Sequence, residues 1–574
     1  MRILLVTYRY GEEITGGGER YLRELMVRLA DRGHEVEVFT TCSRHMVISP
    51  FSYLVWDNFL EPGREEDRGV GINRFKAKNP RPRKAQKLVG KLNDLQKKER
   101  SYPELITLMA GALRGQREHC YLSGWHELEI WEDGPARWTR GRADLAVGGI
   151  GIKGLRIEAY SYLDGHLHVE VPGKGSWEFE LEKGRPRELY LDFSPCDGIP
   201  VRLHVPQTVR PTEDDRVVGV AVRKVVIEDD EGEHELDLAR DWNAFLENGP
   251  EKAVGEVLWA AAGTRPRRTS RWHRYLMGPR SPRLERGVMS AARDFDIVLG
   301  SMVPMTTMHL AWKAAKKAGK PLVAFPLFHT RDPNHYWMHF KNVLDGADGV
   351  EANSPVIAEL MTGWGFDAFA VGPGFDLDEF SSPHIDGRRF RDEFGFGDRP
   401  LLLWVARKNV YKGYHEAIST LQAVQQEERQ VALALIGPDE DHLPVSGEGV
   451  YYLGAQPREK VLNAFDACDV FIFPSLHESF CLVFCEAWLR GKPVLGNVYC
   501  AAARGLIENG ENGYLCADAR EYGNRVLELI NDPEKARRMG ERGREKVLRT
   551  RGWDHLVKKM EEKLESIVEN RNQA

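Results

Sequence analysis

Apolar runs alternate with stretches of helical spacing at both ends of the chain. Near the start, residues 2–8 have the length of a buried strand, residues 19–32 have the spacing of an amphipathic helix, and residues 35–40 predict the next strand. Further apolar runs of strand length are residues 322–325, 401–405, 431–436, 450–453 and 470–473. Strands that alternate with helices predict parallel sheets, so the pattern indicates α/β domains at both ends.

The pattern changes between about Tyr121 and Ile227. Short runs such as HLHVEV and WEFELE alternate with period two, and clusters of Gly, Pro and Asp separate them. This texture is typical of an antiparallel β-sandwich or jelly roll. Because β-α-β texture resumes at residues 296–299, the segment is predicted to be an insertion into the first α/β domain.

The insert contains several tryptophans, for which two interpretations stay open. They either fill the core of the sandwich, which we favour for most of them, or offer stacking faces to sugar rings. The residues are Trp125, Trp131, Trp138 and Trp177.

Composition narrows the class of protein. The 574 residues are too many for one core, and 42% hydrophobic with 29% charged residues is typical of a soluble globular chain. A formal net charge of -6 gives no reason to expect a nucleic-acid partner. The 8 cysteines form no CxxC pair, and no apolar run has the length of a membrane helix. We therefore expect a cytoplasmic protein with reduced thiols.

Two stretches are strongly basic, residues 74–91 and residues 265–286. Most such stretches are solvated faces, and we favour that interpretation here. The alternative is peripheral contact with an anionic surface at the inner face of the membrane.

The turn after the first strand contains Gly16, Gly17 and Gly18. Three glycines between a strand and a helix let the backbone come close to a bulky anion such as phosphate. The alternative is a flexible turn without a ligand. The strand that follows the helix completes a β-α-β unit and favours phosphate binding.

A second candidate site is the stretch ESFCLVFCE, in which Glu478 and Glu486 are eight positions apart. A buried strand, a loop and a helix that opens near Leu482 would place backbone N–H groups beside two carboxylates. Such a site suits a polyol that carries phosphate, because carboxylates accept hydrogen bonds from hydroxyls. Solvated glutamates on an ordinary helix are the equally weighted alternative.

Charged residues also follow two predicted strands. Arg407 and Lys412 come after residues 401–405 and could hold a diphosphate, unless they are only surface charges. His329 follows residues 322–325 at a carboxyl edge, where α/β sheets bind ligands. The acidic run at residues 439–441 is expected to be a solvated loop, so no metal is predicted.

Together these motifs resemble glycosyltransferase family 4, the group 1 enzymes that use nucleotide-sugar donors. The glycine turn with its helix, PLFHT, ARKNVYKG and the Glu-x7-Glu stretch follow the order of the family's motifs. The resemblance covers about residues 1–83 and 288–568. The chain departs from the family at Ala406, Lys408 and Cys481, and after Val494.

The resemblance implies an α/β fold of the GT-B type. Two Rossmann-like parallel-sheet domains would face a cleft, with an all-β sandwich inserted in the first. We place the first domain at residues 1–118 and 231–375, the carbohydrate-binding-like insert at 119–230, the nucleotide-sugar domain at 376–550, and a helix that packs back on the first domain at 551–574.

The resemblance also implies transfer of a hexosyl unit, with retention, from a nucleoside diphosphate sugar of the UDP or GDP type. The acceptor would be a hydroxyl of a glycan or lipid-linked molecule, with no permanently bound cofactor and no metal. The alternative is a catalytically weak or inactive glycan-binding protein on the same scaffold. A dinucleotide enzyme is disfavoured because the first turn lacks Gly-x-Gly-x-x-Gly.

The family's site residues can be assigned to positions of this chain. His329 would lie by the transferred sugar, Arg407 and Lys412 would bind the diphosphate, and Glu478 would bind sugar hydroxyls. The remaining donor-binding residues are Gly16, Gly17 and Gly18 at the phosphates, Cys481, Leu482 and Val483 through their amides, and Glu486 at the ribose.

Overall fold

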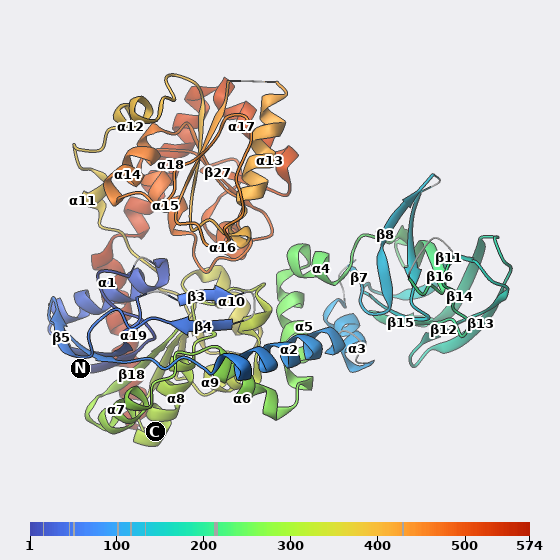
Figure 1. The fold of residues 1–574 in the computed structure, drawn as a ribbon, viewed down its shortest axis with the longest axis horizontal. Helices are drawn as coiled ribbons and strands as arrows, with labels where there is room; N and C mark the ends of the chain where they lie inside the picture. Colours follow the sequence, from blue (N-terminus) through green and yellow to red (C-terminus); the bar gives the residue numbers. More distant parts are fainter. Residues whose placement is uncertain are drawn as a thin grey trace. The chain divides into compact units, whose positions relative to one another are not determined.

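The computed structural model describes residues 1–14, 16–44, 46–49, 52–99, 103–114, 118–132, 134–211, 216–427 and 430–573. The chain forms two compact units (Figure 1). The first joins Met1–Gln86 with Ser270–Ala574, and the second is Lys87–Thr269. Among the described residues, no helix has the length and apolar character needed to cross a membrane.

An eight-stranded sheet organises the N-terminal part of the first unit (Figure 1). Its order is β21-β20-β19-β18-β1-β2-β6-β5, and every pair is parallel except β5 with β6. The strands are β1 (Arg2–Val6), β2 (Glu35–Thr41), β5 (Gly63–Asp67), β6 (Val70–Phe75), β18 (Ile297–Ser301), β19 (Leu322–Phe325), β20 (Gly349–Glu351) and β21 (Ala368–Phe369). Because β1 pairs with β18, the chain leaves this sheet after β6 and returns to its centre.

The last helix of the chain, α19 (Trp553–Gln573), packs against this N-terminal sheet. Trp553, Met560 and Leu564 are buried in the same core as the strand residues of β1 and β18. The Trp553 ring stacks on Tyr21 of α1 (Gly17–Asp31), with centroids 6.2 Å apart and planes 16° apart. The end of the sequence therefore stabilises the domain that the beginning of the sequence builds.

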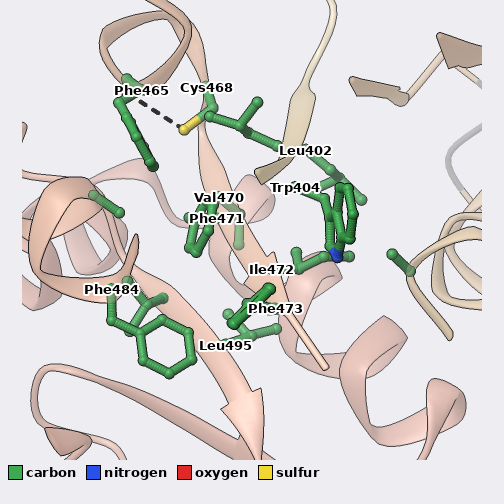
Figure 2. Packing of buried hydrophobic residues seen from close by; sticks show 14 of the residues in the cluster. Leu402, Trp404, Phe465, Cys468, Val470, Phe471, Ile472, Phe473, Phe484 and Leu495 are labelled. Carbon is green, nitrogen blue, oxygen red and sulfur yellow. Dashed lines mark hydrogen bonds between the residues drawn. The ribbon is translucent and has the colours of Figure 1, made fainter. Parts of the chain in front are cut away.

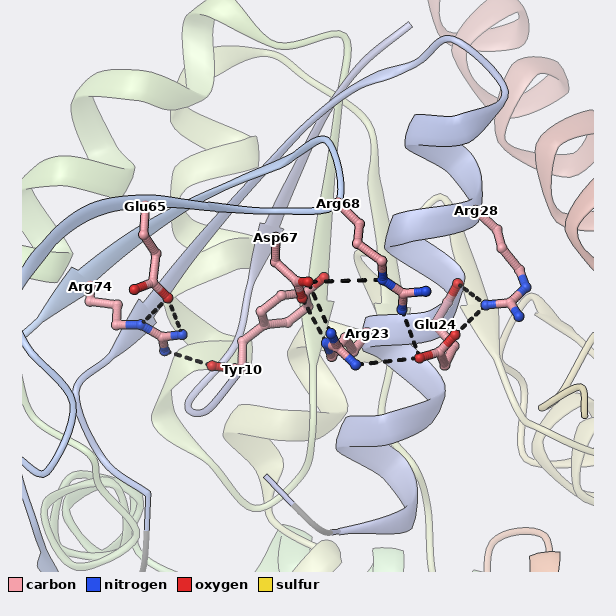
Figure 3. A network of polar contacts seen from close by, with 8 residues as sticks. All are labelled: Tyr10, Arg23, Glu24, Arg28, Glu65, Asp67, Arg68 and Arg74. Atoms are coloured by element: carbon pink, nitrogen blue, oxygen red, sulfur yellow. Dashed lines mark hydrogen bonds and ion pairs between the residues drawn. The ribbon is translucent and has the colours of Figure 1, made fainter. Parts of the chain in front are cut away.

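Ion pairs fix α1 to the edge of the sheet (Figure 3). Arg23 of α1 donates two hydrogen bonds, of 2.6 and 2.9 Å, to the carboxylate of Asp67 at the end of β5. Arg68 reaches Glu24 of the same helix at 2.9 Å. Fork-shaped arginine–carboxylate pairs constrain orientation as well as distance. The β5–β6 hairpin therefore holds the helix that begins at the glycine turn.

A second sheet, six-stranded and entirely parallel, builds the C-terminal part of the first unit. Its order is β24-β23-β22-β25-β26-β27. The strands are β22 (Leu401–Val405), β23 (Ala432–Ile436), β24 (Val450–Tyr452), β25 (Val470–Phe473), β26 (Val494–Asn497) and β27 (Gly513–Cys516). Figure 2 shows its core, where Phe471 and Phe473 meet Phe484 of α15 (Leu482–Leu489) with rings nearly perpendicular. The predicted pair of Rossmann-like parallel-sheet domains is confirmed.

The second compact unit contains a five-stranded and a six-stranded antiparallel sheet that share one core. The first has the order β13-β12-β15-β10-β7 and the second β14-β11-β16-β9-β8, with β17 paired to β16. The strands are β7 (His119–Tyr121), β8 (Trp125–Trp131), β9 (Gly134–Thr139), β10 (Arg142–Val147), β11 (Ile152–Ser161), β12 (Gly165–Val171), β13 (Gly175–Leu181), β14 (Arg187–Cys196), β15 (Ile199–His204), β16 (Val220–Asp229) and β17 (Gly232–Glu235). Trp125 and Trp138 are only 8% and 2% exposed, so these indoles are packing residues.

Helices of the second unit pack against its five-stranded sheet. α3 (Pro103–Ala112) contacts α5 (Glu251–Thr264) and the strands β10 and β15. The second unit, Lys87–Thr269, therefore includes helices before and after its strands.

A buried carboxylate connects β20 to the linker between the two parallel-sheet domains. Glu351 is fully buried, and its Oε1 accepts backbone hydrogen bonds from Asn353 at 3.0 Å, Val371 at 3.2 Å and Gly372 at 2.9 Å. Burial raises the pKa of Glu351 from 4.5 to about 7, although the three N–H groups oppose the rise. The carboxyl group therefore titrates near neutral pH in the folded protein.

We expect Glu351→Gln to flatten the pH dependence of stability between pH 5 and pH 7. In that range the folded protein holds a proton on Glu351 that the unfolded chain has lost. The free energy of unfolding must therefore fall as pH rises, by up to about 1.4 kcal/mol per pH unit. Urea denaturation at several pH values measures the slope. The exposed Glu359→Gln on α10 (Pro355–Gly363) is the control, and an unchanged slope in Glu351→Gln would contradict the assignment.

We also expect Leu564→Ala in α19 to destabilise the N-terminal domain by about 3 kcal/mol, because it leaves a cavity in a fully buried core. The exposed neighbour Glu562→Ala should change the free energy of unfolding by less than about 0.5 kcal/mol. Urea denaturation followed by tryptophan fluorescence compares the two. Equal midpoints would show that the helix does not stabilise this domain.

Candidate functional site

The glycine turn lies against residues from two other loops. A β-carbon on Gly18 would overlap the side chain of Leu327, and one on Gly16 would overlap Glu19. A β-carbon on Gly17 would lie 3.0 Å from Cδ1 of Leu482, the first residue of α15. The starts of α1 and α15 are therefore neighbours. Both helix ends carry partial positive charge and unpaired N–H groups, which together favour an anion.

Cys481 caps α15 in a conformation that glycine normally adopts. Its backbone has φ 68° and ψ 57°, in the left-handed region, and its thiol is buried. For residues other than glycine, this backbone conformation costs about 1–2 kcal/mol of free energy in general. Cys481 therefore adopts the backbone turn that glycine would make, and this turn leaves the first amides of the helix exposed.

Glu478 and Lys412 form an ion pair beside that helix start. Lys412 Nζ donates to Glu478 Oε1 at 2.6 Å and to the carbonyl of His477 at 3.4 Å. The hydroxyl of Ser475 donates to the same carboxylate oxygen at 2.7 Å. The side chains of Lys412 and Glu478 are 14% and 13% exposed, so the pair is largely sheltered from water. Lys412 ends the short helix η3 (Val410–Lys412) that follows β22.

Arg407 leaves the end of β22 and remains more open. Its Nη1 donates to both carboxylate oxygens of Glu440, at 2.8 and 3.1 Å, and its side chain is 44% exposed. The adjacent Lys408 is only 1% exposed and pairs with Asp439 and Asp441.

Residues 439–441 lie in a loop, as predicted, and Asp439 is exposed, but the three acids are paired with basic side chains and are not only solvated. The carboxyl ends of β22 and β23 are adjacent, so the loop after β23 meets the loop after β22. Its three acids neutralise two basic side chains there, as a buried lysine requires.

His329 follows β19, and the groups that lower its pKa come from both parallel-sheet domains. Burial lowers the pKa of His329 well below its ordinary value, and the charges of His335, Lys412, His477 and Arg407 lower it further. The imidazole is therefore neutral at pH 7. Lys412 and Arg407, which the sequence also predicted for the site, are thus near enough to His329 to lower its pKa.

His329, Asp332 and His335 could together hold a metal ion, because one ligand atom of each lies within 4.8 Å of the others. However, Nδ1 of His335 accepts the backbone N–H of His329 at 3.0 Å. The proton of this neutral ring must then be on Nε2, which lies 3.7 Å from Asp332 Oδ2. A metal needs a nitrogen with a free lone pair, so binding would require this backbone hydrogen bond to break.

Sequence reasoning missed several residues that join the loops of the two domains. Asn353 donates from Nδ2 to Ser479 Oγ at 3.1 Å, and Arg331 donates from Nε to the carbonyl of Tyr499 at 2.8 Å. In the sequence, the spacing of His329, Asp332 and His335 marks the loop that carries Arg331. The other contacts join residues more than a hundred positions apart.

Glu486 lies on the second turn of α15 and is almost fully buried. Its Oε1 accepts a hydrogen bond of 2.6 Å from Nη1 of Arg458. No sequence signal paired these two residues. The eight-residue spacing places Glu478 before the helix and Glu486 within it, so the two carboxylates have different surroundings.

Parts of the chain are similar to known proteins. Residues 387–546 match the family model of glycosyl transferases group 1. The chain is 32% identical over 168 residues to a trehalose synthase of Pyrococcus horikoshii, which covers 26% of this chain and 40% of that protein. It is 28% identical over 283 residues to D-inositol 3-phosphate glycosyltransferase 2 of Catenulispora acidiphila, over 42% of this chain and 65% of that protein.

The fold can be compared over nearly the whole chain. A sucrose-phosphate synthase structure from Thermosynechococcus elongatus superposes with a TM-score of 0.51 at 15% identity, covering 99% of this chain and 98% of that one. In contrast, the chain spans only 40% of the length of the first curated relative and 65% of the other. The chain therefore has the GT-B fold, and its residues 387–546 are a group 1 glycosyl transferase domain.

Proposed function

We propose that this chain is a retaining glycosyltransferase. It moves a hexosyl unit from a nucleoside diphosphate sugar of the UDP or GDP type to a hydroxyl of a glycan or lipid-linked acceptor. The observation that carries the proposal is the meeting of two helix starts, at Gly17 and Leu482, beside a loop that carries Lys412. This arrangement suits a pyrophosphate, which needs several N–H donors and compensating positive charge.

The ion pairs at the site are compatible with ligand exchange. A donor diphosphate would take over Lys412 and Arg407, which now bind Glu478 and Glu440. Glu478 would then accept hydrogen bonds from hydroxyls of the donor sugar. The sugar hydroxyls thus supply a partner for the more buried Glu478 (13% exposed), while the Glu440 that Arg407 releases is more open to water (24% exposed).

The chemical step breaks the bond between the anomeric carbon and the phosphate oxygen. Negative charge grows on the departing diphosphate, where Arg407, Lys412 and the amides of Cys481 to Val483 stabilise it. The acceptor hydroxyl forms the new bond to the anomeric carbon, and its proton passes to the departing phosphate oxygen. His329, being neutral, exchanges hydrogen bonds with sugar hydroxyls without adding charge. No step in this scheme passes through a metal.

The other donor contacts follow the same arrangement. Gly16, Gly17 and Gly18 would let the backbone approach the phosphates, and Glu486 would bind the ribose. We place the protein in the cytoplasm, because that compartment suits both a nucleotide-sugar donor and reduced thiols. If the acceptor is lipid-linked, the proposal also includes peripheral contact of the basic helix α2 (Pro82–Glu99) with an anionic membrane.

A second candidate function is glycan binding by a catalytically inactive scaffold. The observation that favours it is the pairing of both cations with carboxylates. Release of nucleoside diphosphate distinguishes the two functions, because a glycan-binding protein would release none. The burial of Trp125 and Trp138 leaves fewer aromatic faces in the insert for sugar rings.

We expect the double variant Arg407→Ala with Lys412→Ala to lose transfer by at least about 1,000-fold, because removal of one such donor already costs 100–1,000-fold. Release of UDP or GDP from a panel of nucleotide sugars measures it. A variant at two exposed, paired positions, Arg542→Ala with Lys558→Ala, is the control and should remain active. Near-normal release by the folded double variant would contradict the proposal.

We expect Cys481→Gly to keep transfer, because glycine adopts φ 68° without cost and leaves the amides of α15 in place. Relief of backbone strain should offset most of the lost thiol packing, so stability should change by less than about 1 kcal/mol. Cys481→Val should lose both stability and transfer, because a β-branched side chain disfavours this backbone region. Thermal midpoints and nucleotide release check both, and a fully active valine variant would disprove the role of the turn.

A further inference from the structure

One guanidinium group binds two carboxylates near the start of α15. Arg458 is the first residue of α14 (Arg458–Ala467). Its Nη1 donates to Glu486 Oε1 at 2.6 Å, while Nε and Nη2 donate to the two oxygens of Glu379 at 2.8 and 3.0 Å. The fork to Glu379 fixes the plane of the guanidinium group. The third contact therefore reaches Glu486 from a fixed direction.

Glu379 is itself held by its surroundings. It lies in α11 (Leu377–Phe380), just after the linker between the parallel-sheet domains, and pairs with Arg20 of α1 at 3.4 Å. Burial would raise its pKa, but the hydrogen bond and charge of Arg458 bring the pKa of Glu379 below its usual value. The Arg458 guanidinium also lies over the Phe380 ring, 5.3 Å from its centroid. The anchor of Arg458 is thus ionised and packed.

Glu486 needs such a partner because of its position. It is 9% exposed, and its helix neighbours Cys485 and Ala487 are fully buried. A carboxylate in this environment is stable only if it is paired and hydrogen-bonded. A glutamate also has three side-chain torsions, and Arg458 restricts them by binding one oxygen. A fixed carboxylate can accept hydrogen bonds from two adjacent hydroxyls, which a freely rotating one does less well.

We propose that Arg458 is a positioning residue that fixes the Glu486 carboxylate to bind the vicinal hydroxyls of the donor ribose, with Glu379 as its anchor. This inference rests on the proposed function and deepens it, because it names the residue that fixes the carboxylate at the ribose. The rival explanation is a bridge that only holds α11, α14 and α15 together. If Arg458 positions Glu486, its loss weakens the binding of ligands that have ribose hydroxyls and leaves other ligands unaffected. If Arg458 is only a bridge, its loss weakens both kinds of ligand equally.

The test is calorimetric titration of the full chain with UDP and 2′,3′-dideoxy-UDP, and with the corresponding GDP pair. In the unaltered protein we expect the dideoxy form to bind at least about 10-fold more weakly, because a charge-assisted hydrogen bond is lost. In Arg458→Met this ratio should fall below about 3-fold, with the affinity for the dideoxy form unchanged. Glu486→Gln should reduce the ratio in the same way, and Arg458→Lys should restore part of it.

Arg490→Met is the matched control. Arg490 follows α15, pairs with Asp466 and donates to the carbonyl of Phe380 at 2.6 Å, so it joins the same elements without touching Glu486. Its ratio should remain at about 10-fold. Equal weakening of both ligands by Arg458→Met, or no change in the ratio, would overturn the inference in favour of the bridge. If the unaltered protein binds neither UDP nor GDP, the proposed function fails, and the inference fails with it.

Discussion

Charge neutralisation at the carboxyl ends of the C-terminal strands is the constraint on which the rest of the site depends. Arg407, Lys408 and Lys412 lie in the segment 407–412 that follows β22, and each is bound by a carboxylate from a neighbouring loop. The desolvation of two charges roughly cancels their attraction, so such pairs add little net stability. A negatively charged ligand can therefore replace the carboxylate of such a pair at a small cost in free energy. The more exposed Arg407 and the sheltered Lys412 then differ in how much water the ligand must displace.

The two parallel-sheet domains are joined by two adjacent crossings of the chain. The linker residue Phe375 donates its N–H to the carbonyl of Arg551 at 2.9 Å, just before α19 returns to the N-terminal core. A β-carbon on Gly374 would lie 2.7 Å from the Trp553 ring, so glycine is needed where the crossings touch. Arg551 also donates to the carbonyl of Val371 at 3.0 Å. Backbone groups and the Arg551 side chain therefore make the contacts between the two crossings.

The sequence was informative wherever a property is local. Residues 322–325, 401–405 and 470–473 are strands with those same bounds, because continuous apolar runs mark buried parallel strands. The opening of a helix at Leu482 was likewise visible from the pattern around it. What could not be predicted is which loops meet. The pairs Lys408–Asp439 and Arg458–Glu486 join residues 31 and 28 positions apart through strand order, which hydrophobic periodicity does not encode.

The departures from the family pattern are also easier to understand as coupled changes than as separate losses. Lys408 is one of the positions where the chain departs from the family, and it is buried. A lysine in that place is stable only because Asp439 and Asp441 accept from it and the Tyr414 hydroxyl donates to Asp441 at 2.9 Å. The acidic loop and the unusual lysine are thus one structural unit. Lys408 is thus neutralised within the unit, while Arg407 binds Glu440 of the same loop and Lys412 binds Glu478. Under the proposed function, Arg407 and Lys412 are the cations that a diphosphate would recruit by displacing these carboxylates.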